Sequence, residues 1–325
     1  MKKILFLWST SFWDRIASIP YLLKMKEEWN KVYLLEYWEW YINYLHKQSD
    51  IYSLYKDNNL YEDLFIIPHN KFKLILFILK NFHKFDLAYA PTWTLVNNIR
   101  WLLFWKKWKY TFKSLNDNTK YDNFVSWMLE SKETDFFKFS KKIKIFHSKN
   151  YHELVWWNQK FVTIFVWPYS WSIEAEEWNN IIKYIESSWL KIILLWSKSN
   201  DREWWILPYL NGWNIINLLW KTNFEDLCSI ISDAEYTISA NWWIMWLSHL
   251  LNEKSISFST TSWAMIHPPV DNKKSFHIKS SCNIPCELKL SEMNFKKKYH
   301  QKCKFGLICK MLRWEKIINI IEKFY

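Results

Sequence analysis

Glycine is the residue that this 325-residue sequence most clearly lacks, since it has only 2 glycines. A globular chain carries about 7% glycine, and glycine supplies most of the positive-φ residues that turns require. No apolar run reaches about 18 residues, so the sequence predicts no membrane-spanning helix. The apolar start also predicts no secretory leader, because Asp14 and Arg15 precede any small-residue cleavage site. Hydrophobic residues make up 50% of the chain, which excludes a disordered protein.

Tryptophan is present in excess, with 26 residues, and many stand where turns favour glycine. Trp29 and Trp189 each follow a helix-like segment and precede a strand-like one, where helices commonly end on glycine. Glycine and tryptophan together number 28, close to an ordinary glycine content. We hypothesise that most of these tryptophans are glycine in the cell, as expected where UGA encodes glycine. The alternative is a truly tryptophan-rich protein that stacks sugars on indoles, but stacking indoles would not follow turn signals.

Strand-like and helix-like segments alternate along most of the chain. The expected strands are 3–7, 31–37, 63–68, 86–90, 161–166, 191–195, 214–219, 235–240 and 255–260. The expected helices are 16–28, 73–85, 121–130, 174–188, 224–234, 243–251 and 314–325. This alternation predicts an α/β protein with parallel sheets and crossover helices. Because the pattern restarts after a polar stretch, we expect two Rossmann-like domains, 1–155 and 156–325, that face a central cleft. Ligands of such sheets bind beyond the carboxyl ends of the strands.

The loop after the first expected strand ends in Trp13 and Asp14, where a helix begins. An aspartate at the mouth of the cleft can take a proton from an acceptor hydroxyl as a general base. The alternative is that Asp14 only caps the helix and complements its dipole.

Two further glycine-like loops follow strands of the second domain. One contains Asn241, Trp242, Trp243 and Met245, and the other contains Ser170 and Trp171. Backbone N–H groups at the start of a helix form an anion site that suits a diphosphate. The alternative for the first loop is an ordinary turn with Asn241 as the helix N-cap.

With tryptophan read as glycine, nearly the whole chain resembles the lipopolysaccharide heptosyltransferases of glycosyltransferase family 9. The resemblance is carried by 3–14, 191–196, 217–222, 224–227 and 240–245. It implies the GT-B fold, with Asp14 as the general base and 156–325 as the nucleotide-sugar-binding domain. The implied donor-binding residues are Trp13, Ser170, Trp171, Lys198, Lys221, Asn241, Trp242, Trp243 and Met245. Enzymes of this type generally need no metal, and the sequence contains no Asp-x-Asp motif, so we expect no cofactor.

The sequence departs from the family pattern at three positions. Asn241 replaces the acidic residue of the last motif, and Trp246 replaces its histidine. Glu174 lies where the family has a lysine near the donor phosphate. A departing diphosphate needs a positive partner, for which Lys198, Arg202 and Lys221 are candidates.

The last part of the chain combines cysteine with lysine. The spacing of Cys282, Cys286, Cys303 and Cys309 allows a zinc site, but free thiols in a reducing compartment fit it better. Cys228 is expected in the core. The net charge is +12, with a peak at Lys296–Lys298. This basic stretch is either a solvated face or a surface that attracts anionic lipid or glycan. No motif supports nucleic acid as a partner.

The sequence therefore predicts a metal-independent glycosyltransferase that moves a heptose-like sugar from a nucleotide diphosphate to a cell-envelope glycan or lipid. We expect it in the cytoplasm. The sequence leaves open whether it also contacts the inner face of the membrane peripherally. Two alternatives remain at this point. One is a nucleotide-sugar epimerase of the same fold, and the other is a degenerate, non-catalytic protein that binds glycan or nucleotide.

Overall fold

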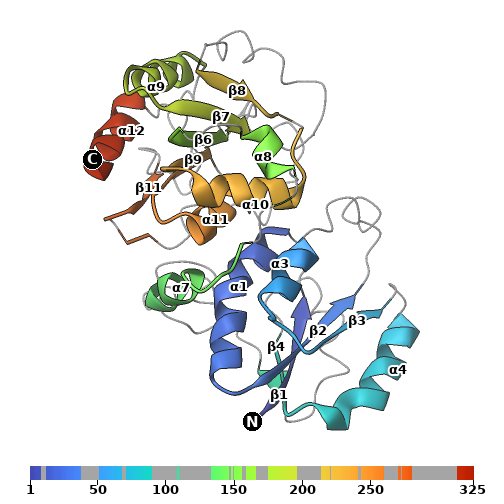
Figure 1. Ribbon diagram of the computed structural model, residues 1–325. Helices are drawn as coiled ribbons and strands as arrows, with labels where there is room; N and C mark the ends of the chain where they lie inside the picture. Colours follow the sequence, from blue (N-terminus) through green and yellow to red (C-terminus); the bar gives the residue numbers. More distant parts are fainter. Residues whose placement is uncertain are drawn as a thin grey trace, which may run out of the picture. The chain divides into compact units, whose positions relative to one another are not determined.

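The computed structural model of the chain divides into two compact units (Figure 1). Unit 1 comprises 1–146 with 223–225, and unit 2 comprises 147–222 with 226–325. The structure describes residues 1–8, 12–37, 51–67, 71–89, 108–109, 133–145, 148, 150–155, 159–165, 175–195, 214–219, 221–240, 243–259, 270–271, 273–279 and 313–325. The predicted helix at 121–130 lies outside these residues, and the assignment of ligands to the two units stays a prediction.

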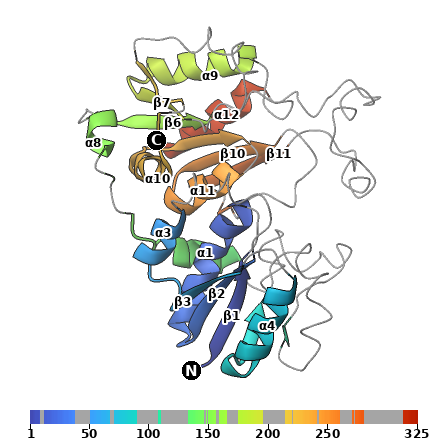
Figure 2. The same cartoon turned by 90° about the vertical axis from the view of Figure 1, so that its right-hand side faces the viewer.

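Unit 1 is built on a five-stranded parallel sheet with the order β3-β2-β1-β4-β5. Its strands are β1 (Lys3–Trp8), β2 (Lys31–Tyr37), β3 (Asp63–Ile67), β4 (Leu87–Tyr89) and β5 (Trp108–Lys109). Its helices are α1 (Phe12–Glu27), α3 (Ile51–Asp57), α4 (Lys71–Asn81), the 3-10 turn η2 (Phe82–Lys84) and α7 (Glu133–Ser140). Figure 2 shows α4 on the face of the sheet opposite to α1. Right-handed crossovers require this, because β1-α1-β2 and β3-α4-β4 run in opposite directions across the sheet.

Apolar side chains explain why these elements pack. Ile4 and Phe6 of β1 are buried, as are Leu34 and Leu35 of β2, which are neighbours on opposite faces of the strand. A parallel sheet covered on both faces requires such continuous apolar strands.

Unit 2 is built on a six-stranded parallel sheet with the order β11-β10-β9-β6-β7-β8. Its strands are β6 (Phe161–Phe165), β7 (Lys191–Leu195), β8 (Ile215–Asn217), β9 (Thr237–Ala240), β10 (Ser255–Ser259) and β11 (Ser275–Lys279). Its helices are α8 (Tyr151–Leu154), α9 (Ala175–Ser187), α10 (Phe224–Asp233), α11 (Trp243–Leu251), α12 (Trp314–Ile321) and the 3-10 turn η9 (Glu322–Phe324). Figure 1 shows α9 and α12 on one face of this sheet and α10 and α11 on the other.

One apolar core cluster of unit 2 lies between its sheet and the α9–α12 pair. Trp178 of α9 is fully buried, and its ring lies 5.6 Å from that of Phe258 in β10. Ile317 and Ile321 of α12 join the same cluster. The backbone N–H of Trp314 donates to a carboxylate oxygen of Glu177 at 2.6 Å, which ties the start of α12 to α9.

Most of the predicted elements are confirmed, and the predicted α/β class with parallel sheets is the observed one. The strands 31–37 and 191–195 and the helix 243–251 occur with the predicted bounds. Three short helices, α3, α7 and α8, and the strands β5 and β11 were not predicted from the sequence. In the part of the chain that the structure describes, no helix has both the length and the apolar character to cross a membrane.

Candidate functional site

In unit 1 the connection from β1 to α1 lies at the point where the strand order reverses. The chain proceeds from β1 outward to β2 and β3, and then returns to β4 on the other side of β1. Ligands of open α/β sheets bind beyond the carboxyl ends of the strands at such a switch point. Asp14 is the third residue of α1 and Trp13 the second, so both lie in the helical turn that follows β1. Their side chains are outside the described part of the structure. Asp14 is therefore inside the helix and does not precede it as an N-cap.

Two buried hydroxyl groups fix the first turn of α1. Tyr55 of α3 donates a hydrogen bond from its hydroxyl to the carbonyl oxygen of Arg15 at 2.6 Å. Ser18 donates to the same carbonyl at 2.8 Å, and the two hydroxyl oxygens lie 3.0 Å apart. Tyr55 and Ser18 are buried, and so is Arg15. Because Arg15 directly follows Asp14, these bonds hold the backbone at the position of the candidate base.

Tyr55 and Ser18 were not predicted from the sequence as part of this site. Tyr55 is 40 residues away from Arg15 in the chain, and it belongs to a helix of seven residues that lacks an acidic residue in its first turn. Neither local spacing nor a motif points to this contact.

In unit 2 the strand order reverses between β6 and β9. From β6 the chain moves outward through β7 to β8, and then returns to β9 on the other side. The register aligns Thr163 with Thr237 and Phe165 with Ser239, so β6 and β9 end side by side. The loop that contains Ser170 and Trp171 follows β6, and the loop that contains Asn241 and Trp242 follows β9. Lys198 follows β7, which is the other neighbour of β6.

The candidate donor-binding residues are described to different extents. Ser170, Trp171, Lys198, Asn241 and Trp242 lie outside the described residues. Trp243 is the first residue of α11, but its side chain is not described. Lys221 is exposed in the turn between β8 and α10, and its backbone N–H donates to the carbonyl of Leu218 at 3.1 Å. Met245 is only 3% exposed and forms part of the core. Its contact with a donor stays a prediction.

A buried polar group lies close to the carboxyl end of β9. The Ser239 side chain is fully buried, and its hydroxyl has no hydrogen-bond partner among the described residues. One turn into α11, Trp246 is also buried. This tryptophan stands where the family resemblance implies a histidine.

Two histidines of unit 2 share one hydrogen-bond partner. The Ser257 hydroxyl lies 2.9 Å from Nε2 of His249 and 2.9 Å from Nδ1 of His277, and thereby links α11, β10 and β11. His249 is buried. Because both histidines bind the Ser257 hydroxyl, these contacts account for the three residues as a structural link.

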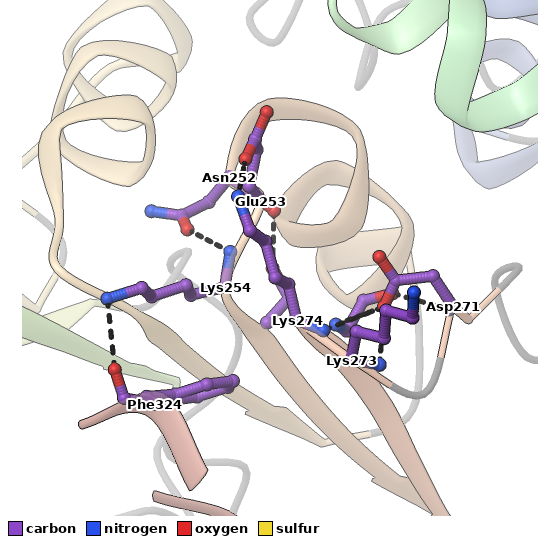
Figure 3. A network of polar contacts seen from close by, with 9 residues as sticks. Asn252, Glu253, Lys254, Asp271, Lys273, Lys274 and Phe324 are labelled. Carbon is purple, nitrogen blue, oxygen red and sulfur yellow. Dashed lines mark hydrogen bonds and ion pairs between the residues drawn. The ribbon is translucent and has the colours of Figure 1, made fainter.

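A polar network fixes the start of β11 (Figure 3). One carboxylate oxygen of Asp271 accepts hydrogen bonds from the backbone N–H groups of Lys273, Lys274 and Ser275, each at 2.8–2.9 Å. Partial burial acts to raise the pKa of Asp271, but these hydrogen bonds outweigh it and hold the pKa below its ordinary value. Lys274 also donates from Nζ to Glu253 at 2.6 Å. The network is on the surface and secures an edge strand.

The expectations on metal, thiols and basic charge fall largely outside the described residues. Cys282, Cys286, Cys303, Cys309 and Lys296–Lys298 all lie there. Cys228 is buried in the core, as predicted. Within the described ranges, no three histidine, cysteine or acidic residues gather into a group that could hold a metal ion.

Comparison with solved structures identifies the fold. The chain matches a glycosyl transferase family 9 structure from Veillonella parvula DSM 2008 with a TM-score of 0.65 at 11% identity, covering 99% of this chain and 97% of the other. It matches E. coli heptosyltransferase WaaC with ADP at a TM-score of 0.61 and 12% identity, covering 99% and 100%. It matches E. coli ADP-heptose lps heptosyltransferase II at 0.58 and 12%, covering 99% and 98%. The protein has the GT-B fold. No family model and no curated protein matches the sequence.

Proposed function

We propose that this protein is a glycosyltransferase that moves a sugar from a nucleotide diphosphate donor to a cell-envelope glycan or lipid. The main support is the fold, since the chain spans the full length of several heptosyltransferase and glycosyltransferase structures. In each unit, candidate residues follow strands that border the switch point, where α/β sheets bind ligands, although Lys198 and Lys221 follow β7 and β8.

In the proposed reaction Asp14 takes the proton from an acceptor hydroxyl while that oxygen attacks the anomeric carbon of the donor sugar. The bond from the anomeric carbon to the donor phosphate breaks, and the nucleoside diphosphate leaves with the bonding electrons. A general base in this position contributes roughly 10²- to 10⁴-fold to turnover. Tyr55 and Ser18 act as positioning residues, because they hold the carbonyl of Arg15 next to the base.

The leaving diphosphate gains negative charge, so it requires positive or hydrogen-bonding partners. We propose Lys198 and Lys221 as the cations, with the loops of Ser170–Trp171 and Asn241–Trp243 as the backbone cradle. Trp13 and Met245 complete the proposed donor site. Lys221 is exposed in the turn before α10, whereas Met245 is packed in the core. We propose an ADP-linked, heptose-like donor, since solved structures of this fold include heptosyltransferases with ADP and with an ADP-heptose.

The acceptor is proposed from charge. The chain carries a net charge of +12, with lysines concentrated near the C-terminus. Such a balance attracts anionic glycans and anionic lipid headgroups. We therefore propose a cytoplasmic protein that works at the inner face of the membrane, without a metal ion.

The test is a coupled measurement of donor binding and sugar transfer on the full chain. ADP binding is measured by calorimetry, and release of ADP from ADP-heptose is followed with an envelope glycolipid acceptor. We expect ADP binding and acceptor-dependent release. ADP binding without any release from a panel of nucleotide sugars would favour the non-catalytic alternative, and failure to bind any nucleotide would contradict the proposal.

Asp14→Asn separates the base from a residue that only supports the helix. Asparagine keeps a side-chain oxygen but cannot accept the proton, so we expect turnover to fall at least about 100-fold with donor affinity unchanged. Loss of the charge near the helix N-terminus should lower stability by no more than about 1 kcal/mol. Turnover close to that of the parent chain would remove Asp14 from the mechanism.

A further inference from the structure

Two helix ends in this protein adopt a backbone conformation that suits glycine but carry tryptophan. Trp29 and Trp189 both have φ of 61°. In the described part of the chain, Asn59 with φ of 52° is the one other non-glycine residue with positive φ. The left-handed region forces Cβ against the following carbonyl oxygen, a clash that glycine avoids and that asparagine tolerates better than other residues.

The hydrogen bonds at these sites define the same type of helix ending. The N–H of Trp29 donates to the carbonyl of Lys26 at 3.0 Å, and the N–H of Asn30 donates to that of Met25 at 3.3 Å. These two bonds form the Schellman motif, in which the left-handed residue is usually glycine. Asn59 occupies that position after α3, where its N–H donates to Lys56 at 2.8 Å and that of Leu60 to Tyr55 at 2.9 Å. Trp189 follows α9 and donates to Glu186 at 3.1 Å.

The fold requires these turns to be tight. Three residues connect α1 to β2, and three connect α9 to β7. Each connection closes the first strand–helix–strand repeat of its unit, and each places its tryptophan at the same point. Short helix-to-strand loops of this kind favour glycine at the helix end.

Burial does not compensate for the backbone cost at these positions. Trp29 is 83% exposed and Trp189 is 81% exposed. By contrast, Trp178 and Trp246 lie inside helices and are almost completely buried. An exposed indole gains little from removal of apolar surface from water, so it cannot offset an unfavourable φ.

From these observations we infer that residues 29 and 189 are glycine in the protein made by its own cell. On this inference the codon for both residues is UGA, which the cell reads as glycine and which the printed sequence renders as tryptophan. The composition agrees, because 26 tryptophans stand beside only 2 glycines. Neither of these glycines, Gly212 and Gly306, lies in the described part of the chain. This inference does not depend on the proposed glycosyltransferase activity.

Peptide mass spectrometry on the protein purified from its native cells tests the inference directly. Trypsin releases residues 27–31 after Lys26 and residues 184–191 after Lys183. We expect each peptide at the mass of the glycine form. Tryptophan in both peptides would overturn the inference.

A second test measures the backbone cost in protein produced with the printed sequence. Trp29→Gly and Trp189→Gly should each raise the midpoint of thermal unfolding by about 2–4 °C. Trp29→Ala and Trp189→Ala are the matched controls, because alanine removes the indole but keeps the Cβ that clashes at positive φ. We expect alanine to recover clearly less than glycine, and Asn59→Gly to change the midpoint little.

The controls make the result decisive. If alanine raises the midpoint as much as glycine does, the cost comes from the exposed indole and the conformational argument is wrong. If glycine gives no increase at either position, tryptophan is tolerated there and the argument is likewise wrong.

Discussion

At the scale of single residues, the carbonyl oxygen of Arg15 is the best-defined contact point beside the candidate base. It accepts hydrogen bonds from Tyr55 and Ser18 in a buried setting. A buried hydrogen bond contributes about 0.5–1.5 kcal/mol net, and more is lost when one partner is left unsatisfied. The two hydroxyls therefore act on one acceptor and should depend on each other.

Tyr55→Phe and Ser18→Ala test this dependence in a double-mutant cycle. Each single substitution should lower the free energy of unfolding by about 1 kcal/mol, since the other hydroxyl still binds the carbonyl. The double variant should differ from the sum of the singles by at least about 0.5 kcal/mol, as measured by urea denaturation. Additive losses would show that the two groups act independently. If Asp14 is the base, Tyr55→Phe should also lower kcat more than it changes donor affinity.

At the scale of secondary-structure elements, α8 and the preceding Ser148 are held against α10 by polar contacts near the two ends of that helix. The Tyr151 hydroxyl donates to Asp233 at 2.5 Å, and Ser148 donates from its hydroxyl to Asp226. Burial and the hydrogen bond to Asp233 raise the pKa of Tyr151 well above its ordinary value. The segment that begins unit 2 is thus fixed to a helix about 80 residues further along the chain.

Tyr151→Phe should lower the free energy of unfolding by about 1–2 kcal/mol at neutral pH. Because the pKa of Tyr151 is higher in the folded protein than in the unfolded chain, its contribution is fully present below about pH 10. It is lost as the pH rises from there toward the folded pKa, so the difference between parent and variant should shrink. Chemical denaturation at pH 7, 9 and above 10 measures this trend.

The control for this series is Tyr184→Phe. Tyr184 contacts Glu322 at 3.4 Å in an exposed setting, so its removal should change stability little. A difference between parent and Tyr151→Phe that stays constant or widens above pH 10 would contradict the expected linkage.

The elements also show what a sequence can and cannot predict. The strands 31–37 and 191–195 were predictable because their buried positions form continuous apolar runs bounded by turn signals. β11 was missed although Ser275–Lys279 alternates polar and apolar residues as a half-buried strand does, because so short a run within a lysine-rich stretch also fits a solvated loop. For the candidate site, the positions of Ser170–Trp171 and Asn241–Trp242 after strands were predictable, since β6 and β9 were themselves predictable. The strand order that brings the ends of β6 and β9 together was not, since it depends on pairing between distant segments.

At the scale of the whole molecule, each unit has its own sheet and its own switch point. The first is bordered by β1 and β4, and the second by β6 and β9. The proposed division of labour assigns the nucleotide to unit 2. Binding of a nucleotide diphosphate should therefore protect one unit more than the other.

Hydrogen–deuterium exchange on the full chain with and without ADP measures this difference. We expect added protection in the peptides that follow β6 and β9, because backbone N–H groups there would bind phosphate oxygens. The peptide that contains Trp13 and Asp14 should change less, since Trp13 is its one proposed donor contact and Asp14 serves the acceptor. Protection confined to unit 1 would reverse the assignment of the two units.

The central position of β6 has a consequence for how the protein is made. On one side β6 pairs with β7, but on the other it pairs with β9, whose residues lie more than 70 positions later. A nascent chain must therefore wait for residue 240 before the open edge of β6 is paired. At about 5–20 residues per second, that interval lasts roughly 4–15 s. During this time the nascent chain exposes an apolar, unpaired strand edge. Chaperones shield edges of this kind, and edges left exposed promote aggregation.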